Sequence, residues 1–127
     1  MALTTFKAIK FDSLAPILAS AAAARKRFDS ISEHVANFTL ASGNENVLHM
    51  ADHAATVIDV QLPLHATDPI PLRSVYTVAQ KGAAIFQFVG EAGVTVRGGV
   101  KSWDQYTFLN AVKIADNEWW IIGGSDV

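Results

Sequence analysis

The chain of 127 residues contains no cysteine, and only 17% of its residues are charged. Without cysteine there is no disulfide, no thiol nucleophile and no thiolate metal ligand. The formal net charge of -2 carries no positive excess of the kind that binds nucleic acid. Half of the residues are hydrophobic, which is too many for a disordered chain. These absences leave a folded protein of one domain's length, with a core that needs no cross-link.

The sequence also lacks an apolar run that could span a membrane. Its most apolar stretch, Leu14 to Ala24, is shorter than the ~20 residues that a helix needs to cross a bilayer. A basic run, Arg25 to Arg27, follows this stretch directly. We therefore expect neither a membrane nor a nucleic acid among the partners of the protein.

Motifs that carry chemistry are missing as well. There is no G-x-S-x-G motif, and no lysine directly follows any glycine between Gly90 and Gly99. His49 and His53 are four residues apart, but their surroundings predict a loop or the start of a strand, and no glutamate or cysteine completes a ligand set. The carboxylates lie mainly at predicted turns, where solvated carboxylates are expected. We predict no catalytic residue, no metal site and no cofactor, and hence no enzyme.

Apolar residues of the N-terminal third alternate at spacings of three and four, as in a heptad pattern. Ser13 precedes the pattern as a candidate cap, and Gly43 follows it. Ser30 and Glu33 have the spacing of a second capping box, so the pattern predicts one helix over residues 14–40 or two shorter ones. An extended arm over residues 1–12 is expected before it. The apolar positions are Leu14, Ile17, Ala21, Ala24, Phe28, Ile31, Val35 and Phe38.

This predicted helix has two alternative partners. It packs on the β domain of its own chain, or it associates with other copies around a symmetry axis. In the second case Ala21 and Ala24 allow close approach but bury little area. The candidates for a subunit or partner interface are Phe28, Ile31, Val35 and Phe38, together with Trp120 near the C-terminus.

Turn-forming residues at positions 41–46, ASGNEN, separate the helical pattern from a region of strands. The predicted organisation is an arm and helical segment over residues 1–45 and an antiparallel β domain over residues 46–127. The fold class is therefore mainly β, with an N-terminal arm and helix followed by a small antiparallel β-sandwich or barrel. The predicted strands lie in TVIDVQLP, SVYTVAQKG, AAIFQFVGEAG, VTVRGG, YTFLNAVKIAD and NEWWIIGG.

Two tight hairpins are predicted between these strands. Lys81 and Gly82 suit a turn that joins the second and third strands, because glycine adopts positive φ freely. Asp116 and Asn117, in the sequence ADNE, suit a second turn before the last strand.

The last strand raises the question of its two adjacent tryptophans. Side chains alternate across a strand, so Trp119 and Trp120 point to opposite faces. Trp119 and Ile121 share the face expected in the core. Trp120 then needs another cover, either a helix of the same chain or a neighbouring subunit.

Residues 55–124 contain several pieces in a fixed order. These are TVIDVQLP, then PIPLRSVYTVAQKGAAIFQF, then GEAGVTVR, and then Gln105 ahead of LNAVKIADNEWWIIGG. Together they resemble a small β module of tailed-bacteriophage virion proteins, which recurs in head-decoration, tail-fibre and spike components. The module closes with a polar turn, an asparagine, one residue, a tryptophan and an apolar strand to glycine, and Asn117, Trp119 and Gly123 match this pattern. Trp120 departs from it, since the module commonly has a smaller apolar residue there.

The resemblance implies a bacteriophage structural protein, located in the virion, that acts by protein–protein binding. For a chain of this size we expect a head-decoration (cement) protein that stabilises the capsid, and a short tail, fibre or adaptor component is the alternative. The resemblance also implies self-association as a homotrimer and binding to other virion proteins such as the major capsid protein. An NTF2-like small-molecule-binding protein or enzyme is the alternative of another class, and it requires a deep apolar pocket.

Overall fold

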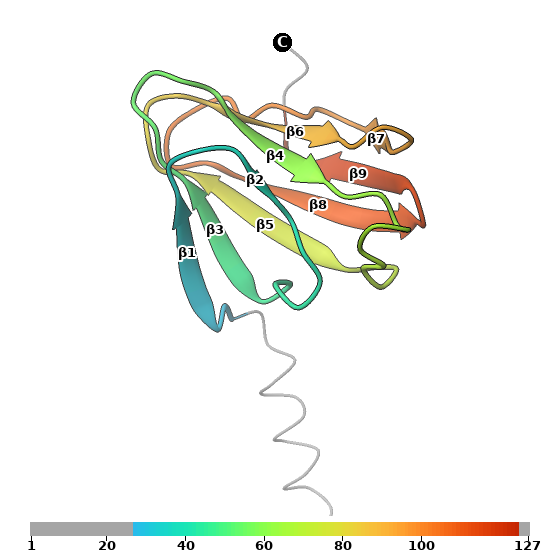
Figure 1. The fold of residues 1–127 in the computed structure, drawn as a ribbon. Coiled ribbons are helices and arrows are strands. Elements are labelled where there is room, and N and C mark those ends of the chain that lie inside the picture. Colours follow the sequence, from blue (N-terminus) through green and yellow to red (C-terminus); the bar gives the residue numbers. More distant parts are fainter. Residues whose placement is uncertain (1–26, 125–127) are drawn as a thin grey trace, which may run out of the picture.

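Strands form the regular structure of the residues that the structure describes. The computed structural model describes residues 27–124, and its strands lie in two layers (Figure 1). The larger sheet has six strands in the order β1-β3-β5-β8-β9-β7, and the smaller sheet has three in the order β2-β4-β6. The strands are β1 (Ser30–His34), β2 (Phe38–Thr39), β3 (Val47–Ala51), β4 (Ile58–Leu62), β5 (Val75–Gln80), β6 (Phe86–Gly90), β7 (Thr95–Arg97), β8 (Phe108–Ala115) and β9 (Glu118–Ile122).

The chain winds alternately through the two sheets. β1, β3 and β5 lie side by side and parallel in the larger sheet, and β2, β4 and β6 do the same in the smaller one. The hairpin of β8 and β9 then adds to β5 through antiparallel pairing. β7 precedes this hairpin in sequence but pairs in parallel with β9 at the far edge of the larger sheet. Because each turn of the winding adds a strand to both sheets, their inward faces enclose a single core.

Alternating burial explains why these segments are strands. In β5, Tyr76 and Val78 are fully buried, and the residues between and beside them face the opposite side. In β9, Trp119 and Ile121 are buried, whereas Trp120 between them is 48% exposed. Such a period of two fits a strand with one face on a core and does not fit a helix.

Aromatic rings close the core between the sheets. Trp119 packs against Tyr76 with 5.8 Å between ring centroids, and Phe86 and Phe88 of β6 meet edge to face at 5.8 Å. The hydroxyl of Tyr76 donates a hydrogen bond to the carbonyl oxygen of Ala41 at 2.6 Å, which ties the β2–β3 connection to the core. The buried apolar residues are Leu40, Ala51, Ile58, Val60, Leu62, Ile70, Tyr76, Val78, Phe86, Phe88, Leu109, Ala111, Trp119 and Ile121.

The helix predicted over residues 14–40 is wrong where the structure describes this segment. Strands β1 and β2 occupy residues 30–34 and 38–39, and the rest of the prediction, with the arm, falls on residues 1–26, outside the described residues. Residues 30–34 fit the alternation of a strand as well as the helical spacing. Ile31 and Glu33 face solvent, whereas Ser32 and His34 are half-buried. Pairing with β3 satisfies the backbone groups on one side of β1, and this pairing makes the segment a strand. Because β1 and β2 pair with β3 and β4, the sheets extend across the boundary predicted at residue 46.

An antiparallel domain is a correct prediction only for the C-terminal strands. The hairpin with Asp116 and Asn117 in its turn is confirmed, and β8 runs antiparallel to both of its neighbours. The smaller sheet and the strands β1, β3 and β5 are instead parallel. Hydrophobic alternation has the same period in both kinds of strand, so it carries no information on direction.

Lys81 and Gly82 form a corner between the sheets and not the predicted hairpin, because β5 and β6 belong to different sheets. The N–H groups of both residues donate to the carbonyl oxygen of Ala51, at 2.8 and 3.2 Å. A Cβ on Gly82 would collide with the backbone of His53, which follows β3. The glycine is therefore needed because two successive corners of the winding lie directly against each other.

A buried polar network holds this corner in place. The hydroxyl of Ser102 donates to Oε1 of Gln80 at 2.7 Å and accepts from the backbone N–H of Phe86 at 2.8 Å. The Gln80 side-chain amide donates in turn to the carbonyl oxygen of Gly82 at 3.1 Å. The buried polar atoms thus satisfy one another across the gap between the two sheets.

The two adjacent tryptophans provide a test of this fold. Trp119→Ala removes a fully buried ring, and we expect it to lower the free energy of unfolding by about 3–5 kcal/mol. Trp120→Ala removes a ring that is half exposed, and we expect a smaller loss. Urea unfolding of both variants measures the difference, and a larger loss for Trp120→Ala would contradict the packing described here.

Candidate functional site

The side of the larger sheet that points away from the smaller sheet is mainly apolar, and we call it the outer face. The strand register aligns its residues in rows, and one row crosses five strands from Ile31 on β1 to Ile122 on β9. A second row aligns Val75, Val112 and Trp120. The outer face consists of Ile31, Glu33, Leu48, Met50, Val75, Thr77, Ala79, Thr95, Arg97, Phe108, Asn110, Val112, Ile114, Glu118, Trp120 and Ile122.

Large apolar side chains of the outer face are open to solvent. Ile31, Phe108 and Ile122 are 61%, 60% and 57% exposed, and Trp120 and Ile114 are 48% and 44% exposed. Within residues 27–124, no segment packs over these side chains. Single exposed apolar residues are ordinary, but a continuous apolar area of several strands marks a binding surface.

The outside of the smaller sheet is different. Gln87 donates a side-chain hydrogen bond to Asp59 at 2.8 Å, and the Thr39 hydroxyl donates to Gln61 at 3.2 Å. Val89, 38% exposed, is the large apolar side chain exposed on this sheet. One sheet therefore shows solvent the polar surface that is usual for a sandwich, whereas the other shows an apolar one.

Polar groups on the outer face are already paired within the chain. The Thr77 hydroxyl donates to the side chain of Asn110 at 2.7 Å in the middle of the face. Glu33 forms an ion pair with Lys81 near one edge of the sheet. Arg97 forms an ion pair with Glu118 at 3.2 Å near the opposite edge. An apolar partner can therefore cover the face without leaving an unpaired charge on it.

Trp120 is held in a fixed orientation on this surface. Its indole N–H donates to a carboxylate oxygen of Glu118 at 2.7 Å, and the same oxygen accepts from Arg97. The hydrogen bond from Trp120 and then the charge of Arg97 hold the pKa of the Glu118 carboxyl below its usual range. The ring is thus oriented before any partner binds, which reduces the entropy cost of binding.

The interface residues predicted from the heptad stripe do not lie on one surface. Ile31 lies on the outer face, as does Trp120, but Phe28 precedes β1 and Val35 follows it. Phe38 lies on β2 in the other sheet and stacks on the ring of His34 at 3.5 Å between centroids. Sequence reasoning missed most of the outer face, including Leu48, Phe108 and Val112. The alternation that marks Phe108 and Val112 lies in a predicted strand, whereas β3, with Leu48, was not among the predicted strands.

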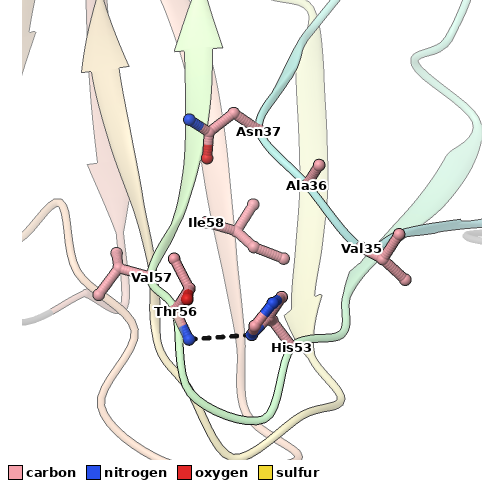
Figure 2. Close-up of a pocket in the computed structure, with 7 residues that line it drawn as sticks. All are labelled: Val35, Ala36, Asn37, His53, Thr56, Val57 and Ile58. Atoms are coloured by element: carbon pink, nitrogen blue, oxygen red, sulfur yellow. Dashed lines mark hydrogen bonds between the residues drawn. The ribbon is translucent and has the colours of Figure 1, made fainter.

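A shallow hollow of about 270 Å³ lies between the β1–β2 connection, the β3–β4 connection and the start of β4 (Figure 2). His53 lies at its rim and accepts hydrogen bonds at Nδ1 from the backbone N–H groups of Ala55 and Thr56, at 3.1 and 2.9 Å. This histidine therefore serves its own loop. The lining of the hollow contains no carboxylate and consists of Val35, Ala36, Asn37, His53, Thr56, Val57 and Ile58.

His49 is a core residue on β3 and does not meet His53. A hydrogen bond of 3.0 Å joins its Nδ1 to Nε2 of His34, and Phe38 stacks beside both rings. Burial lowers the pKa of both histidines, and the charge of His34 lowers that of His49 further. In the part of the chain that the structure describes, no group of His, Asp and Glu side chains is arranged to hold a metal ion.

Lys113 is a fully buried cation on the inward side of β8. Its ammonium group donates to the carbonyl oxygen of Ile70 at 2.7 Å and lies 2.8 Å from Nδ1 of His65. Burial lowers the pKa of this lysine. The contacts fasten the long β4–β5 connection to the C-terminal hairpin, so we assign Lys113 a structural role.

Comparison with protein-family models, with curated proteins and with solved structures finds no match to this chain. The described residues contain no helix of the length and apolarity that a membrane span needs. The outer face is therefore the candidate functional site on physical grounds alone.

The histidine pair makes stability depend on pH. A pKa below the ordinary value of 6.5 means that the unfolded chain binds protons more readily than the folded one. The stabilising effect is thus complete above about pH 6.5 and is lost as the pH falls below it. We therefore expect the urea concentration at the midpoint of unfolding to be lower at pH 5 than at pH 7.5.

A double variant isolates this effect from the carboxylates. His34→Phe combined with His49→Phe replaces both hydrogen-bonding partners by rings of similar shape, which preserves packing. We expect its stability to decrease less between the two pH values than that of the wild type. An equal decrease in both proteins would contradict the assignment.

Proposed function

We propose that this protein is a structural component of a tailed-bacteriophage virion and acts by protein–protein binding. A head-decoration or cement protein is the form of this role that we favour. The resemblance of residues 55–124 to a virion β module supports it. The observation that carries the binding role is the outer face, where exposed apolar side chains of β1, β8 and β9 lie beside partly exposed ones of β3 and β5.

Chemistry of the described residues also favours binding over catalysis. The buried titratable groups, His49 and Lys113, are engaged in packing and in hydrogen bonds that hold the fold. An NTF2-like function requires a deep apolar pocket. Between these two sheets, Trp119, Tyr76 and Phe86 fill the corresponding space with side chains. These residues therefore support a protein-binding function better than a function that needs a catalytic or substrate-binding pocket.

The partners that we propose are further copies of the chain, as a homotrimer, and other virion proteins such as the major capsid protein. In a decoration role the protein occupies many equivalent positions on the capsid. In the alternative role, as a short tail, fibre or adaptor component, it occupies few. The copy number in the particle therefore separates the two roles.

Quantitative mass spectrometry of purified particles tests this proposal. Particles are purified from a lysate in which the chain is expressed from its own phage genome. We expect the protein in the particles, at a copy number comparable to that of the major capsid protein. A copy number near that of known tail proteins favours the alternative role. A protein abundant in the lysate but absent from the particles contradicts both.

A further inference from the structure

We infer that the outer face is the surface through which copies of this chain bind one another. This inference rests on the proposed function, because it names the partner of the surface on which that function depends. It also moves the self-association site away from the heptad stripe and onto a flat sheet. Two identical faces packed on each other are related by a two-fold axis, so this contact makes a dimer and replaces the three-fold contact of a homotrimer. Trp120, which the core of its own domain leaves uncovered, becomes part of a subunit interface.

The outward sides of the two sheets differ in polarity. Both sheets pack their inward sides on the same core, so the fold itself does not require either outward side to be apolar. The smaller sheet has Asp59, Gln61 and Gln87 outside. The larger sheet has Leu48, Val112 and other apolar side chains outside, spread over five strands. The hydrogen-bonded pair of Thr77 and Asn110 lies among them. Such a surface is costly in water unless it is covered.

Charge decides which kind of partner fits. The charged residues of the outer face, Glu33, Arg97 and Glu118, are paired within the chain, and Lys81 completes the pairing. Their sum is neutral, so an identical face meets no net repulsion. A partner selected by charge would find no unpaired group to recognise. A second copy offers the same neutral, apolar surface, which is the requirement for a self-complementary contact.

The size of the face agrees with a specific contact. Strands about 4.8 Å apart and five residues long give six strands a projected area on the order of 400 Å². With the relief of the side chains, two copies packed face to face bury on the order of 1,000 Å², the scale at which specific interfaces begin. Trp120 has the character of an anchor, since it is aromatic, is oriented by Glu118 and lies between Val112 and Arg97 in the sheet.

The test compares two matched substitutions in the full-length chain. Ile122→Lys places a charge on the outer face, and Val89→Lys places the same charge at an exposed position of the smaller sheet. Both replace a β-branched residue in a strand, so their effects on strand propensity are alike. Light scattering after size-exclusion chromatography measures the mass of each protein, against 13.7 kDa for one chain.

We expect the wild type and Val89→Lys to have twice the mass of one chain. Ile122→Lys should be monomeric, with self-association weakened at least ~10-fold. A monomeric wild type overturns the inference. So does an Ile122→Lys variant that keeps the oligomeric mass, because association then uses another surface.

Folding of the variants is checked by circular dichroism and thermal unfolding. Should Ile122→Lys fail to fold, Ile122→Thr keeps a β-branched side chain at the same position. The association constant of Ile122→Thr, measured by sedimentation equilibrium, is then expected to fall while that of Val89→Thr does not. Equal association constants for the two variants overturn the inference.

Failure of this inference is distinct from failure of the proposed function. A monomer that is found in purified particles leaves the virion role intact and rejects self-association through the outer face. An oligomer that depends on Ile122 but is absent from particles keeps the interface and rejects the virion role. The oligomeric mass therefore tests the interface, and the composition of the particles tests the virion role.

Discussion

The packing of Trp119 against Tyr76 is the contact on which the rest of the structure depends. Tyr76 lies on β5, the last strand of the winding in the larger sheet, and Trp119 lies on β9, in the C-terminal hairpin. Their contact joins the parallel and the antiparallel parts of one sheet over a common core. Because neighbouring residues of a strand face opposite sides, burial of Trp119 forces Trp120 outward. The core therefore places position 120 on the outer face, where this sequence has an aromatic ring.

Buried polar groups fix the connections between the strands that surround this contact. The larger sheet places Gln80, His49 and Lys113 on its inward side, and each one is tied to a loop or to the neighbouring strand by a hydrogen bond. Lys113 fastens the β4–β5 connection, and Gln80 fastens the corner after β5. An isolated buried polar group costs free energy, whereas a paired one fixes a single arrangement. These groups therefore specify how the connections lie, while the apolar core supplies the stability.

Much of the C-terminal half can be predicted from the sequence, because strong local signals coincide there. The strands β4 to β9 follow runs of β-branched and aromatic residues, and the turn at Asp116 and Asn117 has local chemistry that suits a hairpin. The segment around Ile31 misleads, since its apolar spacing fits a helix as well as a strand, and only pairing with β3 decides. Strand direction is not readable either: the corner at Gly82 resembles a hairpin turn until the long-range contact with His53 is known.

The candidate site also depends on long-range strand pairing, which the sequence does not show. The sequence alone predicts that Trp120 lies outside the core, because side chains alternate along a strand and Trp119 points inward. Its neighbours on the outer face come from six strands spread over the whole described sequence, and the order of those strands is what brings Leu48, Val112 and Ile122 together. A stripe along one helix can be read from spacing, whereas a sheet face requires the pairing of every strand. The apolar surface is thus a property of the topology, and an interaction through it depends on the whole sheet being formed.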